Sequence, residues 1–183
     1  YQDKNGNLRA TLSASVSTTV LAPAAAIVIN EIYSYGTTEW LEIANPTSSQ
    51  VDISGWRIYV GNTRIYTFPA NTVLGAFGSG SEYLTISLTN DLPNPGGTVS
   101  LRLGDGRTII DMTTYPRLES GESWARFKAP DTGLPVDTNN DANDFYISQS
   151  PTPSAYNDRT RPLMTLSKVA DKSQAQPGEL IIY

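Results

Sequence analysis

IVINEIYSYGTTEWLEIANPTSSQVDISGWRIY, residues 27–59, is the stretch of the sequence that decides the fold. Residues 26–33 and 39–44 alternate apolar with polar side chains, and Asn45-Pro46 ends the second run. Successive side chains of a strand point to opposite faces, so this alternation is typical of strands buried on one side. The stretch therefore predicts short strands joined by tight turns.

The same pattern of short strand-like runs separated by turn residues continues to residue 128. Residues Gly61-Asn62 and the Gly-Asp-Gly run at 104–106 each separate two strand-like runs and predict hairpins. No stretch shows the apolar spacing of a helix. The predicted strands are residues 26–33, 39–44, 56–60, 64–68, 83–88, 98–103, 108–113 and 123–128. About eight short strands over roughly a hundred residues predict an all-β sandwich.

The distribution of charge argues against nucleic acid as a partner, and the length of the apolar runs argues against a membrane span. The 183 residues carry 13 basic and 18 acidic side chains, a net charge of −5. The arginines do not form the basic stripe that nucleic acid needs, since Arg102, Arg107, Arg117 and Arg126 are spaced apart among acidic residues. The apolar run at 21–29 is too short to cross a membrane and contains Pro23. We expect neither nucleic-acid binding nor a membrane span.

Catalytic residue types are scarce. The chain has no His and no Cys, which removes the usual general base and thiolate nucleophile. Glu39 and Glu42 are three residues apart and would point to opposite faces of a strand. Glu31 could converge with either of them across strands, but no other catalytic group accompanies such a pair. The sequence predicts that the protein is not an enzyme.

Several short motifs together resemble a known family, the lamin-tail domain. Its opening resembles INE (29–31), EWLEI-N (39–45) and D-x-SGW (52–56) of this chain. ESWAR (122–126) and SPTPSAYN (150–157) of this chain resemble the C-terminal part of prokaryotic members of the family. The resemblance implies an immunoglobulin-like sandwich that accompanies secreted or surface proteins. Residues 129–157 are rich in Pro, Asp, Asn and Ser, and we expect them to wrap back over the sandwich through Phe145 and Tyr146.

The two ends resemble a different family. Residues 164–183 are similar to the first strands of a repeat found in tandem in large prokaryotic surface proteins, and residues 1–20 to its last strands. The expected division is residues 1–25 as the strand-like end of a preceding repeat, 26–157 as the lamin-tail domain, and 158–183 as linker and first strands of a following repeat. The chain begins without Met or signal peptide, and we interpret both ends as cuts.

Residues 137–144, DTNNDAND, are the one constellation with metal-ligand chemistry. Oxygen ligands that alternate along a loop are typical of calcium sites. Ala142 stands where an EF-hand has Gly, and Ser148 where it has Glu. The candidate calcium ligands are Asp137, Asn139, Asp141 and Asp144. The alternative is a loop whose Asp and Asn side chains cap its own backbone without metal.

The aromatic residues leave a second question open. Trp40, Trp56 and Trp124 sit within strand-like runs, where packing in the core or along the strands is the expected role and sugar stacking the alternative. An exposed cluster of Tyr35, Tyr59, Tyr66 or Trp56 would favour carbohydrate binding.

The functional prediction is a non-catalytic structural, assembly or adhesion module on the outside of the cell. Because an unpaired strand can join the edge of another sheet, the terminal segments could link neighbouring domains or identical subunits into filaments by strand exchange. The alternative is a module that binds carbohydrate or another envelope component through exposed aromatic rings and calcium.

Overall fold

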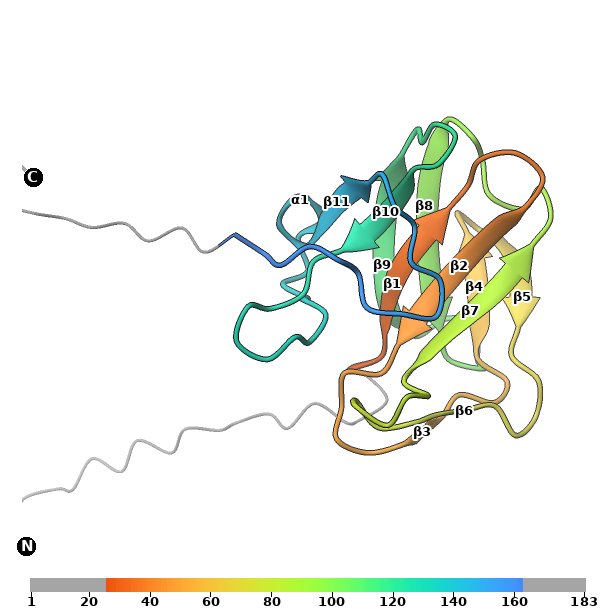
Figure 1. Cartoon of the computed structure of the whole chain (residues 1–183). Coiled ribbons are helices and arrows are strands. Elements are labelled where there is room, and N and C mark those ends of the chain that lie inside the picture. Colours follow the sequence, from red (N-terminus) through yellow and green to blue (C-terminus); the bar gives the residue numbers. More distant parts are fainter. Residues whose placement is uncertain (1–25, 163–183) are drawn as a thin grey trace, which may run out of the picture.

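Two antiparallel sheets lie face to face in the computed structural model, which describes residues 26–162 (Figure 1). One sheet has five strands in the order β11-β10-β1-β2-β7, and the other has four in the order β5-β4-β8-β9. The strands of the first sheet are β1 (Val28–Tyr33), β2 (Glu39–Ala44), β7 (Tyr83–Leu88), β10 (Ser123–Arg126) and β11 (Phe145–Ser148). Those of the second are β4 (Arg57–Val60), β5 (Thr63–Thr67), β8 (Gly96–Arg102) and β9 (Ile109–Pro116).

The expected immunoglobulin-like β-sandwich is confirmed, and both predicted hairpins form. Strands β4 and β5 are joined at Gly61, whose φ of +56° lies in the left-handed region that glycine adopts without strain. Strands β8 and β9 pair antiparallel along most of their length, from Gly96 opposite Pro116 to Arg102 opposite Ile109.

The core lies between the two sheets and is filled by the apolar members of the alternating runs. Ile29, Ile43, Ile58 and Leu101 are fully buried. Trp56, at the start of the second sheet, is also buried in this core. Burial of such side chains contributes about 1.5–3 kcal/mol each relative to exposure, which is why alternation can specify the sandwich.

Four elements were not expected from the sequence. They are β3 (Val51–Asp52), β6 (Val73–Leu74), β11 and the single helical turn α1 (Asp141–Asp144). Two-residue strands and a four-residue helix are too short to show a period, so no pattern could reveal them. The expectation that no helix forms is corrected by α1, whose turn is closed by backbone bonds from Asn143 and Asp144 to the Asn140 carbonyl.

Segment 129–157 returns over the sandwich, as expected from its aromatic residues. Strand β11 adds to the edge of the five-stranded sheet by pairing with β10, and its Phe145 and Tyr146 are buried. The terminal segments expected to be strand-like, residues 1–25 and 163–183, lie outside the described residues.

Candidate functional site

Two glutamates lie opposite each other on neighbouring strands of the five-stranded sheet. Glu31 of β1 and Glu42 of β2 are partners in the register, next to a bulge in β1 between Ile29 and Glu31. Both side chains are fully buried. The segment that covers them is residues 150–157, here called the strap.

The strap holds both carboxylates through its backbone and hydroxyl groups. Thr152 donates to Glu31 from its backbone N–H (3.1 Å) and from Oγ1 (3.0 Å). The backbone N–H of Ser154 donates to Glu42. The sheet donates as well, through Ser123 Oγ to Glu31 and through Asn30 Nδ2 to Glu42 at 2.8 Å. Each carboxylate thus ties the strap to the sheet beneath it.

Asn157 closes the strap at its end. Its side chain is buried and donates from Nδ2 to the carbonyl oxygens of Arg126 (2.7 Å) and Asn30 (3.2 Å). The motifs INE, EWLEI-N, ESWAR and SPTPSAYN therefore meet in one hydrogen-bond network, although they lie up to 127 residues apart in the sequence. A buried polar group needs such partners, because leaving it unpaired costs about 1–3 kcal/mol.

The geometry of the network suits a structural role, because both glutamates are buried beneath the strap. Burial raises the pKa of Glu31, and burial also raises the pKa of Glu42, to about 7, against the lowering effect of the hydrogen bonds to it. The structure does bring Glu31 and Glu42 together, as the sequence allowed, but both are closed off from solvent by the strap. Glu39 lies apart and accepts hydrogen bonds from the backbone N–H groups of Asp91 and Leu92.

Arg126 is a charged residue within the core. It is 2% exposed, and its guanidinium donates to the Ile29 carbonyl (2.8 Å), the Val136 carbonyl (2.8 Å) and Asp111 Oδ2 (2.7 Å). The same guanidinium lies 4.3 Å from the centre of the Phe145 ring. Arg126 therefore links β1, β9 and the loop that begins at Val136.

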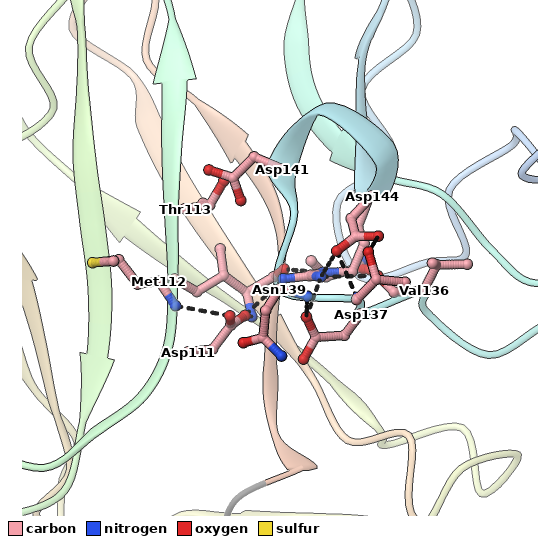
Figure 2. Close-up of polar contacts among 12 residues, drawn as sticks. Asp111, Met112, Thr113, Val136, Asp137, Asn139, Asp141 and Asp144 are labelled. Atoms are coloured by element: carbon pink, nitrogen blue, oxygen red, sulfur yellow. Dashed lines mark hydrogen bonds and ion pairs between the residues drawn. The ribbon is translucent and has the colours of Figure 1, made fainter.

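The predicted calcium loop lies beside this arginine through Asp137 and Asp144. Figure 2 shows these two side chains together with Asn139 and Asp141 of the same loop. Asp144 is buried and turns back into its own loop, where it accepts hydrogen bonds from the backbone N–H of Thr138 (2.7 Å) and of Asn140 (3.2 Å). Its Oδ2 also lies 4.0 Å from Arg126 Nη1. Both charge and hydrogen-bonding capacity of Asp144 are met from within the protein.

The other candidate ligands point to different partners. Asp137 Oδ1 accepts from the backbone N–H of Asn139 and lies 3.4 Å from Arg126 Nη1. Asp141 Oδ2 accepts from the backbone N–H of Thr114 on β9, at 2.8 Å. Between residues 26 and 162, no three acidic side chains are gathered as a metal site requires. This geometry matches the self-capped loop that the sequence left open, and calcium binding stays a prediction.

The tryptophans pack as expected. Trp56 is buried, Trp40 stacks on Tyr33 with ring centres 5.8 Å apart, and Trp124 stacks on Phe145 at 5.4 Å. The aromatic cluster that would favour carbohydrate binding does not form among the four residues named for it. Tyr59 lies under the Arg102 guanidinium, and Tyr66 packs edge-on against Phe68.

Sequence reasoning missed the polar residues that build the network. Asn30, Arg126 and Asn157 are nearly fully buried, yet the sequence marks each of them only as part of a motif or as a dispersed charge. The available signal was a polar residue inside an otherwise apolar run, such as Asn30 between Ile29 and Ile32.

The comparison with protein families agrees with this geometry. The lamin-tail domain family model matches residues 21–143, about two thirds of the chain. The chain belongs to the lamin-tail domain family, whose members are immunoglobulin-like structural domains not known as enzymes. A search of curated proteins found no match. In residues 26–162, no helix is both long and apolar enough to cross a membrane.

Proposed function

We propose that this lamin-tail domain is a non-catalytic structural module of an extracellular surface protein, which joins neighbouring domains or identical subunits by strand addition. Composition supports the structural part of this proposal, because the chain has no His or Cys. The network around Glu31 and Glu42 adds to that support, since it uses its carboxylates to fasten the strap.

The observation that carries the proposal is the difference between the two edges of the four-stranded sheet. At one edge, β9 is capped: the backbone N–H of Met112 donates to Asp111 Oδ1 and that of Thr114 to Asp141 Oδ2. At the other edge, β5 pairs with β4 and, among residues 26–162, with no further strand. In the described part of the chain, no side-chain hydrogen bond involves residues 63–67 of β5.

An edge of this kind suits the addition of a strand. Unpaired backbone N–H and C=O groups of an edge strand can pair with an incoming segment, and proteins usually blunt such edges. The β5 sequence TRIYT is rich in residues that favour strands, with one charge at Arg64. The terminal segments of a neighbouring chain, with strand-like runs at residues 10–21 and 163–183, are the proposed donors.

Sedimentation velocity of the full chain tests the proposal. We expect the sedimentation coefficient to rise with protein concentration, because head-to-tail strand addition is a heterologous contact that does not close. Proline removes a backbone donor, so Leu166→Pro combined with Leu12→Pro should lower the association at least tenfold. A monomer at all concentrations would contradict strand addition while leaving the structural assignment of the domain intact.

A further inference from the structure

Three aromatic rings gather where the strap passes the start of β7. The Tyr156 ring centre lies 5.4 Å from that of Tyr83 and 5.8 Å from that of Phe77, both in edge-to-face contacts. Tyr156 is 44% exposed, which is high for a large ring. A cavity of about 260 Å³ adjoins these rings, here called the tyrosine–glutamate pocket. It is lined by Gly80, Glu82, Tyr83, Ser154, Ala155 and Tyr156.

Glu82 is the charged residue of this pocket, and it is incompletely paired. The side chain is 3% exposed. Its Oε1 accepts two long hydrogen bonds, from the Gly78 backbone N–H (3.3 Å) and from Tyr156 Oη (3.4 Å). Its Oε2 is buried and accepts none, and no Lys or Arg of residues 26–162 forms an ion pair with the carboxylate.

The Glu82 carboxylate keeps its charge at neutral pH. Burial raises its pKa, but nearby backbone N–H groups and the Tyr156 hydroxyl outweigh that effect and leave the pKa below its ordinary value. A buried carboxylate without a counter-ion is unfavourable, and an incoming cation relieves that cost. The faces of aromatic rings also attract cations.

We propose that the tyrosine–glutamate pocket binds the ammonium group of a lysine side chain presented by a protein partner. An ammonium group has three N–H donors, no acceptor and a positive charge. It supplies the counter-ion that the Glu82 carboxylate, which lines the pocket, lacks among residues 26–162. A neutral sugar could donate a hydrogen bond to the carboxylate but would leave the negative charge without a counter-ion. This inference does not depend on strand addition at β5, since the pocket lies on a different part of the surface.

The experiment uses the full chain and Nα-acetyl-lysine-N-methylamide as the probe, followed by NMR. We expect saturable shifts of the backbone amides of Gly80, Tyr83 and Ala155, with a dissociation constant on the order of 1 mM. Glu82→Gln keeps the shape and removes the charge, and should weaken binding at least tenfold. Tyr156→Leu, a change at an exposed position, should weaken it as well. The matched control is Tyr35→Ala, an exposed tyrosine away from the pocket, which should leave binding unchanged.

Several results would overturn the inference. One is the absence of saturable shifts with the unaltered chain. Another is equal binding by the Glu82→Gln chain, or equal binding of the uncharged analogue Nα-acetyl-norleucine-N-methylamide. Saturation of the same amides by a neutral oligosaccharide, with loss of lysine selectivity, would assign the pocket to carbohydrate instead. A well-dispersed spectrum of each variant shows that it is folded, so a loss of binding reports on the pocket.

Discussion

At the scale of single residues, the stability of the interior depends on the buried charge of Arg126. Its guanidinium neutralises Asp111, lies 4.0 Å from Asp144 and satisfies two backbone carbonyls, all within a nearly closed environment. Removing one partner of a buried ion pair leaves the other charge uncompensated, which costs more than the pair itself contributes.

Arg126→Met is therefore expected to lower the free energy of unfolding by about 3–5 kcal/mol. Methionine keeps much of the apolar stem but leaves Asp111 and Asp144 without the guanidinium. Urea-induced unfolding measured by tryptophan fluorescence gives this value. Arg117→Met is the control, because Arg117 pairs with Glu119 on the surface, and it should change the free energy by less than about 1 kcal/mol. Equal losses in the two variants would contradict the role assigned to Arg126.

Glu42 gives the domain an unusual dependence of stability on pH. Its pKa is raised from 4.5 to about 7 by burial, so the folded state binds a proton more readily than the unfolded state. The stabilisation from that proton is fully present below pH 4.5 and is lost as pH rises through about 7. Burial shifts the pKa of Glu31 and of Asp111 in the same direction.

Thermal unfolding should therefore occur at a lower temperature at pH 8 than at pH 5, with a Glu42 contribution on the order of 3 kcal/mol at most. The chain has no histidine to mask this window. Glu42→Gln cannot titrate and should flatten the slope, whatever its absolute stability. Asp131→Asn, at an exposed position, should keep the slope of the unaltered chain. A melting temperature that rises from pH 5 to pH 8 would show that the buried glutamates do not determine how the stability of the domain depends on pH.

At the scale of elements, the strap is fastened by few groups. Asn157→Ala removes the hydrogen bonds that the buried Nδ2 donates to the backbone carbonyls of Arg126 and Asn30 and to Asn30 Oδ1, and the one that Oδ1 accepts from Thr152 Oγ1. Two backbone carbonyl oxygens then have one partner fewer. We expect a loss of about 1–3 kcal/mol and faster amide hydrogen exchange at Thr152 and Ser154, whose N–H groups bind the two glutamates. Hydrogen exchange by NMR measures this, with Asn94→Ala at an exposed site as control. Unchanged exchange at both amides would mean that the strap is held by other contacts.

The loop at 137–144 has two alternatives, a calcium site and a loop capped by its own side chains, and the hydrogen bonds of Asp141 and Asp144 favour the second. A ligand that binds the folded state alone raises stability by RT ln(1 + [L]/Kd), about 2.7 kcal/mol at a hundredfold excess over Kd. The carboxylates of Asp144 and Asp141 already accept backbone hydrogen bonds, so we expect the melting temperature to be equal in millimolar calcium and in EDTA. A rise in calcium that Asp144→Asn abolishes would establish a calcium site and contradict the self-capped loop.

The sequence predicts the strands in which apolar and polar side chains alternate. It does not predict the elements that are defined by hydrogen bonds to segments distant in the sequence. Strands β2 and β7 were placed at their observed bounds, because Leu41 and Ile43 of β2 and Ile86 and Leu88 of β7 bury alternate side chains. Strand β11 was not predicted, because its four residues are too few to show a pattern and only the pairing with β10 makes them a strand. The network around Glu31 could not be derived, since its donors at 150–157 come from a segment more than a hundred residues away.

At the scale of the whole molecule, the groups that stabilise the sandwich are distinct from the edge proposed for strand addition. The core and the strap network lie inside one body, while β5 is an edge without a cap among the described residues. Capping of β9 by Asp111 and Asp141 limits strand addition there. We therefore expect one edge of the four-stranded sheet, and not both, to accept a strand from a neighbouring chain.

Disulfide cross-linking tests strand addition at β5 most directly, because the chain has no cysteine of its own. A chain carrying Thr67→Cys on β5 is mixed under mild oxidation with an isotope-labelled chain that carries one terminal cysteine. The terminal substitutions are Thr11→Cys, Ser13→Cys, Thr165→Cys, Ser167→Cys and Val169→Cys, each used alone. We expect mixed dimers by mass spectrometry for alternate positions of one segment, and few with Thr114→Cys on β9 as acceptor. Equal yields at both edges, or no mixed dimer at any position, would contradict strand addition at β5.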